Sequence, residues 1–273
     1  QPESRRSLAW QFREMTDQRG ASAVFYEVGP EDLPTYLALG LSIHKLGESA
    51  RVPLANFSLE GSQHKGMRQI VRRCERDGAS FEVVGADAVE PLLDELEAIS
   101  NAWLSGKSTR EKGFSLGAFQ RDYLLRNPVA LVRVGDETVA FANLWLGANG
   151  GEISPDMMRY DPQAAPPSVM EYLFTQLMLY GAEAGYGWFS LGMAPLSGLS
   201  ASPLAPAWNR VGGALYRHGE HFYNFQGLRR YKEKFHPVWE PRYLASPGGL
   251  SLPRVLAQIA SLVSGGMRGA LSR

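Results

Sequence analysis

Two stretches of the chain combine residue types that could carry chemistry, and the first reads as a strand, Glu152 to Tyr160 (EISPDMMRY). Asp156 and Arg159 stand inside it, where charged side chains are rare unless they are paired or functional. Positions three apart on a regular strand face opposite sides, so a direct pair requires a bulge, for which Pro155 is a suitable place. Two interpretations stay open: each charge is paired structurally near a strand end, or a positioned carboxylate and guanidinium bind an amine, a hydroxyl or a phosphate.

The second stretch, Phe222 to Phe235 (FYNFQGLRRYKEKF), interleaves aromatic residues with four cations on a predicted helix. Helical spacing gives this helix an apolar face and a cationic one, formed respectively by Leu228, Tyr231 and Phe235 and by Arg230 and Lys234. Cations beside aromatic rings suit a phosphate-bearing single-stranded end such as the 3′ terminus of tRNA, because bases stack on rings. An ordinary solvated cationic helix has the same composition, so that interpretation also stays open.

Familiar enzyme signatures are missing, including the Gly-x-Ser-x-Gly elbow, the eight-residue phosphate loop and His-Glu-x-x-His. Only His218 and His221 lie close together among five histidines, and without further ligands at workable spacing we expect them on the surface and expect no metal. The segment Asp161 to Ser168 (DPQAAPPS) contains no glycine for a pyrophosphate-binding loop, which argues against coenzyme A, and we expect no cofactor. The single cysteine, Cys74, is expected to be a structural thiol.

Composition indicates a soluble globular chain, with 44% hydrophobic and 21% charged residues among 273. The 28 Lys and Arg balance the 28 Asp and Glu, so any contact with a polyanion must come from a local patch. No run of about 18 apolar residues is present to span a bilayer. The chain begins with Gln1 and lacks a signal peptide, so we expect a fragment or a processed product.

Short apolar strands alternate with amphipathic helices in both halves of the chain. The second half has the order of an N-acetyltransferase-like domain: strands at 129–134, 138–145 and 152–160, a helix at 168–184, a strand at 188–193, a loop at 194–206, helices at 207–217 and 225–235, and a strand at 242–245. The first half is a looser version, with strands at 23–28 and 81–84 and helices at 31–39, 62–77 and 87–104. We therefore predict an α/β (α+β) fold of two tandem N-acetyltransferase-like (GNAT) domains, mixed sheets flanked by helices, over residues 1–106 and 107–273, with a hinge at 105–109 and the site in the second domain.

Three stretches together resemble the C-terminal domain of bacterial phosphatidylglycerol aminoacyltransferases, the multiple-peptide-resistance proteins that comprise the lysyl- and alanyl-phosphatidylglycerol synthases. They are Phe222 to Ala245 (FYNFQGLRRYKEKFHPVWEPRYLA), the strand ISPDMMRY, and the loop Phe189 to Leu196 (FSLGMAPL). The basic helix Gly61 to Arg76 (GSQHKGMRQIVRRCER) is similar too, so the resemblance covers most of the chain. The loop at 198–206 is short and proline-rich, a departure from the family, and receives no site residue.

The resemblance implies a donor, an acceptor and a location. The donor is aminoacyl-tRNA, alanyl or lysyl, the acceptor is phosphatidylglycerol, and the product makes the membrane less negative and resistant to cationic antimicrobial peptides. The fragment is expected at the cytoplasmic face of the bacterial inner membrane, following an N-terminal transmembrane flippase domain of the same full-length chain. We expect alanine as the amino acid, because no extra carboxylate for a lysine ε-ammonium can be placed.

The resemblance also implies a transesterification and its residues. The expected catalytic residues are Asp156, Arg159, Lys232 and Lys234. Asp156 would orient or deprotonate the acceptor hydroxyl or hold the donor α-ammonium, and the three cations would bind phosphate or oxyanion, although the base could equally be the amine of the substrate. The expected substrate-binding residues are Arg229, Arg230, Tyr231, Phe235, Arg242 and Met193, with the first two nearer the tRNA.

Two other functions stay open: a peptidoglycan-precursor aminoacyltransferase that uses the same donor, and a non-catalytic module that binds tRNA or membrane. The tail, Leu252 to Val263, is amphipathic and is favoured as a helix packed on the second domain. The alternative is an interfacial helix on anionic lipid, with Arg254, Arg268 and Arg273 as its positive charges.

Overall fold

The computed structural model describes residues 2–106, 117–199 and 225–263. Hydrogen bonds arrange eight strands in the order β1-β8-β2-β7-β6-β5-β4-β3. The strands are β1 Phe25–Val28, β2 Ser42–Pro53, β3 Ala79–Val84, β4 Val129–Val134, β5 Glu137–Leu146, β6 Glu152–Tyr160, β7 Trp188–Pro195 and β8 Val238–Ser246. The helices are α1 Pro2–Gln18, α2 Leu33–Ala38, α3 Lys65–Arg76, α4 Leu93–Ser105, α5 Arg121–Leu124, α6 Val169–Glu183, α8 Phe225–Glu233 and α9 Leu252–Val263.

The chain divides into two compact units, and each is described by itself. The first unit comprises the described residues of Gln1–Arg51 and Gly192–Ala260, and the second those of Val52–Leu191 and Ser261–Arg273. The mixed α/β architecture with a sheet flanked by helices is confirmed. The division does not follow the predicted boundary at residue 106, since the first unit joins the start of the chain to its last strand. That each predicted half is an acyltransferase-like domain stays a prediction.

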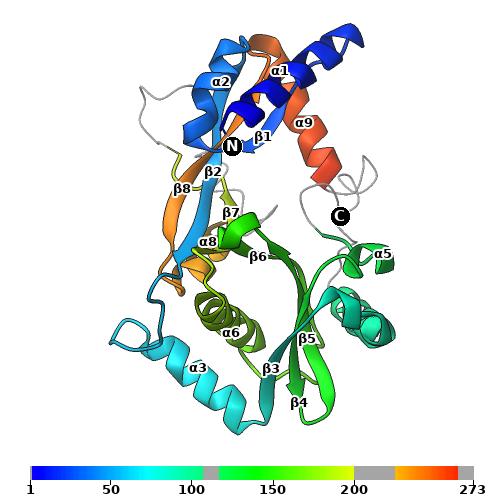
Figure 1. Cartoon of the computed structure of the whole chain (residues 1–273), viewed down its shortest axis with the longest axis vertical. Helices are drawn as coiled ribbons and strands as arrows, with labels where there is room; N and C mark the ends of the chain where they lie inside the picture. The colour runs from blue at the N-terminus through cyan, green and yellow to red at the C-terminus, as the bar shows by residue number, and fades with distance from the viewer. Residues whose placement is uncertain (1, 107–116, 200–224, 264–273) are drawn as a thin grey trace. The chain divides into compact units, whose positions relative to one another are not determined.

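The first unit is built on β8, which pairs antiparallel with β1 on one side and with the long β2 on the other (Figure 1). Successive residues of a strand face opposite sides of the sheet, so β8 contributes to two clusters. Ala245 packs with Ala9 of α1 and Leu41, whereas Leu244 packs with Leu46 of β2 and Val255 of α9. Both faces of this part of the sheet are therefore covered by helices.

Two elements of the first unit, α1 and β2, were not predicted from the sequence. The sequence of β2 (SIHKLGESARVP) mixes charges with small residues such as Gly47, Ser49 and Ala50, which have low strand propensity. These small residues are buried where β2 pairs with β8, so pairing with a distant segment, rather than local pattern, makes this strand.

The second unit contains the antiparallel run β6-β5-β4-β3, and β7 begins parallel to β6 with Trp188 beside Glu152. Helix α4 packs on one face, where Leu96 joins a core cluster with Phe141 and Met157. Helices α3 and α6 lie together beside these strands (Figure 1), and α6 contributes the buried Leu173 and Leu177. This packing holds β6, the strand that carries Asp156, between neighbours on both sides.

The tail helix α9 is packed through one side. Val255 is buried against Leu46 and Leu244, and Leu252, Leu256 and Ile259 lie beside the same cluster. The helix is therefore packed, but on a cluster of the first unit and not on the predicted second domain alone, and Leu262 is 53% exposed. The predicted helix at 207–217, the histidines His218 and His221, the arginines Arg268 and Arg273 and most of the predicted hinge lie outside the described residues.

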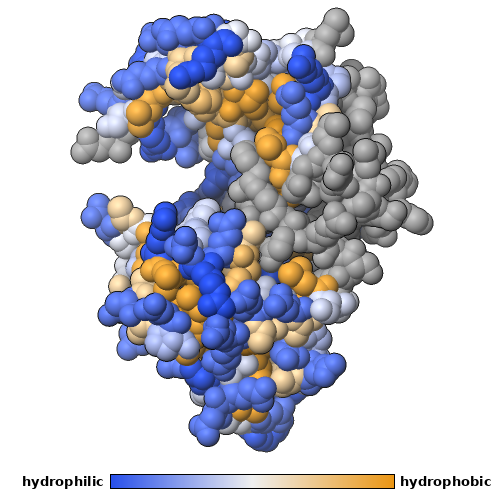
Figure 2. Space-filling view, turned by 90° about the vertical axis from the view of Figure 1, so that its right-hand side faces the viewer, coloured by the Kyte–Doolittle hydropathy of each residue, from blue (hydrophilic) through white to orange (hydrophobic). Residues whose placement is uncertain are grey.

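The surface carries hydrophobic residues among hydrophilic ones, as one face in Figure 2 shows. The exposed large hydrophobic residues include four on α1: Leu8, Trp10, Phe12 and Met15. Within residues 2–106, 117–199 and 225–263, no helix is long and apolar enough to cross a bilayer.

Candidate active site

A bulge in β6 positions Asp156. Ala142 of β5 pairs with Met158 and Leu144 pairs with Pro155, so Asn143 alone stands opposite Asp156 and Met157. The fully buried Asn143 accepts a hydrogen bond from the Met157 N–H through its side-chain oxygen at 2.8 Å. A bulge leaves one backbone group unpaired and re-aims the neighbouring side chain, and here a buried amide satisfies that group. The bulge lies directly after Pro155, where a direct pair between Asp156 and Arg159 would require one, but it does not bring these two side chains together.

The Asp156 carboxylate is held by donors from two other segments. The Tyr123 hydroxyl donates to Oδ2 at 2.6 Å, the Gly117 N–H donates to Oδ1 at 3.1 Å, and Trp145 Nε1 donates to the Tyr123 oxygen at 2.5 Å. A Cβ atom at residue 117 would overlap the carboxylate, so this close approach requires glycine. Burial and the hydrogen bond to Asp156 raise the pKa of Tyr123. We call Gly117, Tyr123, Trp145 and Asp156 the Asp156 cluster.

Arg159 takes different partners from Asp156. It is only 8% exposed, its Nη1 donates to the Met158 carbonyl at 2.9 Å, and its guanidinium carbon lies 4.2 Å from the centre of the Trp103 ring. Burial alternates along β6 even across the bulge, and this alternation places the two charged side chains on opposite sides of the strand. The structure therefore brings Asp156 and Arg159 onto one strand but not into one ion pair.

Lys232 is the buried cation of α8 and belongs to the first unit. It is 7% exposed, and its Nζ donates to the carbonyls of Gly192 at 3.0 Å and Met193 at 2.8 Å. In a regular strand the carbonyls of consecutive residues point in opposite directions. Two consecutive carbonyls that face one ammonium therefore indicate an interruption of the strand, and Gly192 has a φ of 75° at this point. Burial lowers the pKa of Lys232 to about 8, against the opposing charge of Glu27.

Glu27 and Arg242 complete this site. Glu27 lies at the bulge between β1 and β8 with a φ of 59°, a backbone conformation that costs a non-glycine residue on the order of 1 kcal/mol or more. Burial raises the pKa of Glu27, while the charges of Arg242 and Lys232 oppose that rise. Arg242 also forms an ion pair with Glu240 at 3.0 Å. We call Glu27, Gly192, Met193, Lys232 and Arg242 the Lys232 cluster.

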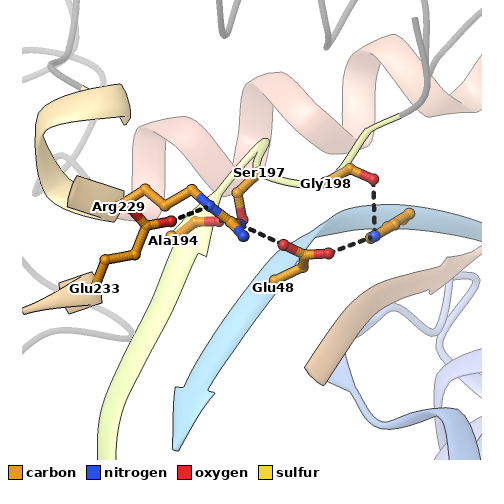
Figure 3. A network of polar contacts seen from close by, with 7 residues as sticks. Glu48, Ala194, Ser197, Gly198, Arg229 and Glu233 are labelled. Carbon is orange, nitrogen blue, oxygen red and sulfur yellow. Dashed lines mark hydrogen bonds and ion pairs between the residues drawn. The ribbon is translucent and has the colours of Figure 1, made fainter. Parts of the chain in front are cut away.

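A network around Glu48 connects β2, the end of β7 and α8 (Figure 3). Arg229 contacts Glu48, its Nε donates to Glu233 at 3.1 Å, and its guanidinium carbon lies 4.1 Å from the centre of the Trp239 ring. Lys45 donates to Glu48 at 3.1 Å and to the Gly198 carbonyl at 2.8 Å. Burial opposes ionisation of Glu48, but the hydrogen bonds from Arg229 and Lys45 lower its pKa.

The other residues predicted on α8 have diverse surroundings. Lys234 is exposed, with its Nζ 5.0 Å from the centre of the Tyr231 ring, and Arg230 is also exposed. Phe235 is 1% exposed and packs edge-on to Tyr231 with 5.8 Å between ring centres. Met193 is partly buried beside Leu244 in addition to its contact with Lys232. That these residues contact a substrate stays a prediction.

The predicted residues thus fall into two groups, Asp156 and Arg159 in the second unit and the remaining eight in the first. Sequence reasoning missed Gly117 and Tyr123, which lie 39 and 33 residues before Asp156, and Asn143, which lies 14 residues before Met157 on the neighbouring strand. Nothing in their local sequence indicates contact with β6. Sequence reasoning missed Glu27 as well, for which a signal existed: a charge within the apolar strand AVFYEV. Among the described residues no group of three or more His, Cys, Asp or Glu could hold a metal ion.

The two clusters lie in different units, and the chemistry of each is considered by itself. A carboxylate fixed by two donors retains further lone pairs that can accept a hydrogen bond from a hydroxyl or an ammonium. A buried ammonium can stabilise phosphate or developing negative charge more strongly than an exposed one, because water screens it less. Either kind of group can serve an acyl transfer to a hydroxyl.

Known proteins match this sequence along nearly the whole chain. The sequence profile of the family described as "Phosphatidylglycerol lysyltransferase, C-terminal" matches residues 1–246. A phosphatidylglycerol lysyltransferase of Bacillus subtilis (strain 168) is 37% identical over 254 residues, which are 93% of this chain and 29% of that protein. This chain spans about 30% of the length of the curated relatives that it matches.

Two solved structures are similar as well. One is the C-terminal domain of a putative lysylphosphatidylglycerol synthetase from Agrobacterium fabrum, with a TM-score of 0.83 and 44% identity, covering 97% of this chain and 80% of that one. The other is the structure of L-PGS from Bacillus licheniformis, with a TM-score of 0.77 and 40% identity, covering 93% and 76%.

Proposed function

The chain belongs to the family of phosphatidylglycerol lysyltransferase C-terminal domains, and from this membership we propose that it transfers an aminoacyl group from aminoacyl-tRNA to a glycerol hydroxyl of phosphatidylglycerol. The observation that carries the proposal is the family match over residues 1–246, because it includes both the Asp156 cluster and the Lys232 cluster. The matching relatives are named lysyltransferases, so we propose lysine in place of the alanine that the sequence favoured.

The proposed reaction exchanges one ester for another. The acceptor hydroxyl oxygen attacks the carbonyl carbon of the aminoacyl ester, a bond forms between them, and the bond to the tRNA ribose oxygen breaks. The proton of the acceptor hydroxyl passes to the departing ribose oxygen. No further energy source is needed, since the donor ester is already activated, and the protein contributes positioning and stabilisation of the oxyanion.

We assign Asp156 to the acceptor hydroxyl or the donor α-ammonium. The Tyr123 and Gly117 donors orient its carboxylate, and a preoriented acceptor loses less entropy when it binds its partner. Lys232 and Arg242 are assigned to phosphate or oxyanion, and the Glu27 carboxyl belongs to the same cluster. Arg159, Lys234 and Arg230 keep their predicted roles as anion-binding residues, and the proton acceptor is Asp156 or the amine of the substrate.

The setting of the reaction is also part of the proposal. We place it at the cytoplasmic face of the bacterial inner membrane, in a longer chain with an N-terminal flippase domain, as the resemblance implies. Lysyl-phosphatidylglycerol carries a positive headgroup, so its accumulation would lower the negative surface potential and weaken the attraction of cationic peptides.

The test is a transfer assay with labelled aminoacyl-tRNA and phosphatidylglycerol vesicles. Lysyl-tRNA and alanyl-tRNA are used in turn, and label in the organic phase is followed with time. We expect lipid label from lysyl-tRNA at many products per enzyme. Label from alanyl-tRNA alone would restore alanine, and no lipid label from either donor would refute the proposal.

The same assay separates the two other functions. A peptidoglycan-precursor aminoacyltransferase would put label into an added cell-wall precursor and leave the organic phase unlabelled. A non-catalytic module would bind tRNA or vesicles without exceeding one product per enzyme.

A further inference from the structure

The outward side of α3 is cationic along its whole length. Lys65, Gln69, Arg72 and Arg76 recur every three or four residues, so they form one ridge over roughly 16 Å, and Arg73 lies beside it. All five residues are exposed. Among the described residues none of the four cations takes part in an ion pair. We call Lys65, Arg72, Arg73 and Arg76 the α3 cationic face.

The rest of α3 is already engaged. Met67, Val71 and Cys74 are buried on the opposite side, where α3 packs near α6 (Figure 1). Arg68 donates to the carbonyls of Leu59 and Gly61 and so fixes the segment before the helix. By the 100° rotation per residue, Glu75 lies about 80° from the ridge on the flank opposite Arg73, and Asp77 follows the last residue of the helix.

We propose that the α3 cationic face binds the phosphate backbone of the donor tRNA. The inference rests on the proposed function for the identity of the RNA. The chain has no net charge, so attraction to a polyanion must come from such a local face. A rigid row of unpaired cations matches a backbone that presents regularly spaced charges, and it contacts RNA without reading bases.

The alternative partner with negative charge is a lipid surface, and the composition of α3 argues against it. An interfacial helix inserts large apolar side chains below the headgroups. The exposed large hydrophobic residues of the described chain include none on α3, whose apolar side faces the protein. Apolar residues are exposed instead on α1, including Trp10 and Phe12.

The α8 helix is a less suitable backbone contact than the sequence predicts. Arg229, predicted nearer the tRNA, is bound to Glu48 and Glu233 and stacked on Trp239, so its charge is already compensated. The four cations of the α3 cationic face have no acidic partner among the described residues.

The test measures binding of uncharged tRNA as a function of salt concentration. The variant Arg72→Gln/Arg76→Gln is compared with a control of equal charge, Arg6→Gln/Arg19→Gln, whose residues are exposed on and after α1. Removing two phosphate contacts should lower the slope of log K against log salt by about 1 to 2 and raise the KM for charged tRNA at least tenfold. The control should keep the slope of the parent protein.

Each other outcome is decisive. An unchanged slope in Arg72→Gln/Arg76→Gln, with retained folding by circular dichroism, overturns the inference. Reduced binding to phosphatidylglycerol vesicles with unchanged tRNA binding would assign the face to the membrane instead. The salt slopes of the parent protein and of Arg72→Gln/Arg76→Gln can differ as expected while the parent protein transfers nothing to lipid. In that case the proposed function fails, and the assignment of the α3 cationic face to tRNA stands.

Discussion

Lys232 allows the electrostatics of the site to be tested through stability. Its pKa is about 8 in the folded chain and 10.5 when unperturbed. Below pH 8 the ammonium is charged in both states, so the folded state bears the full cost of burying it. Between pH 8 and pH 10.5 only the unfolded state keeps the proton on Lys232, so the free energy of unfolding rises with pH. Above pH 10.5 the lysine is neutral in both states, and the cost of burying its charge is gone. Between pH 7 and 9.5 the gain is about 2 kcal/mol.

The measurement compares urea unfolding of the parent chain and Lys232→Met at pH 7 and pH 9.5. Met keeps the length of the side chain but cannot titrate, so the difference between the two proteins isolates this group from other titrations. We expect the parent chain to gain about 2 kcal/mol relative to the variant over this range. Lys234→Met, which changes an exposed lysine on the adjoining turn, serves as the control and should show no such change.

The same pKa gives a prediction for activity. If Lys232 stabilises phosphate or oxyanion as a cation, kcat/KM falls as pH rises through about 8. A rise through that pH would make Lys232 the general base instead. A stability difference that stays constant with pH would refute the reasoning, because it would mean that burial does not disfavour the ammonium.

Three further substitutions test the surrounding geometry. Asp156→Asn should reduce transfer about a hundredfold or more with the fold intact, and near-parental rates would remove this residue from the site. Asn143→Ala leaves the Met157 N–H of the bulge without its acceptor and should cost about 1 to 3 kcal/mol in denaturant unfolding; an unchanged midpoint would contradict that role. Gly198→Ala should destabilise the chain more than Gly20→Ala. The φ values are similar, 65° and 62°, but only at Gly198 would the added Cβ overlap the Glu48 side chain. Equal losses of stability would show that backbone strain alone matters.

The sequence indicated those parts of the fold that depend on local pattern. The hairpin of β4 and β5, the strand β6, the long α6 and the tail α9 follow hydrophobic periodicity and turn residues, and their predicted bounds lie close to the observed ones. The strand β2 could not be predicted in this way, because its small and charged residues become a strand only when β8 pairs with it.

The site shows the same limit at the level of single side chains. The sequence singled out Asp156 because a charge inside a strand is unusual, yet it could not identify Tyr123, whose hydroxyl comes from a separate segment. It assigned Lys232 and Lys234 to phosphate or oxyanion and Arg229 and Arg230 to the tRNA, but it could not tell which of these four cations is buried. Tertiary contacts make them different: two backbone carbonyls accept hydrogen bonds from the buried Lys232, and Glu48 and Glu233 compensate Arg229. The side chains of Lys234 and Arg230 are exposed.

That difference has a consequence for catalysis. A helix of four similar cations would bind anions but would titrate far above physiological pH, because lysine and arginine ordinarily hold their protons. Burial brings the pKa of Lys232 to about 8, within the range where its charge can change during a reaction. The strained backbone at Glu27 and the positive φ at Gly192 keep a carboxylate and two carbonyls near that ammonium. We therefore expect the pH dependence of transfer to follow Lys232, whose positive charge is lost as pH rises through about 8.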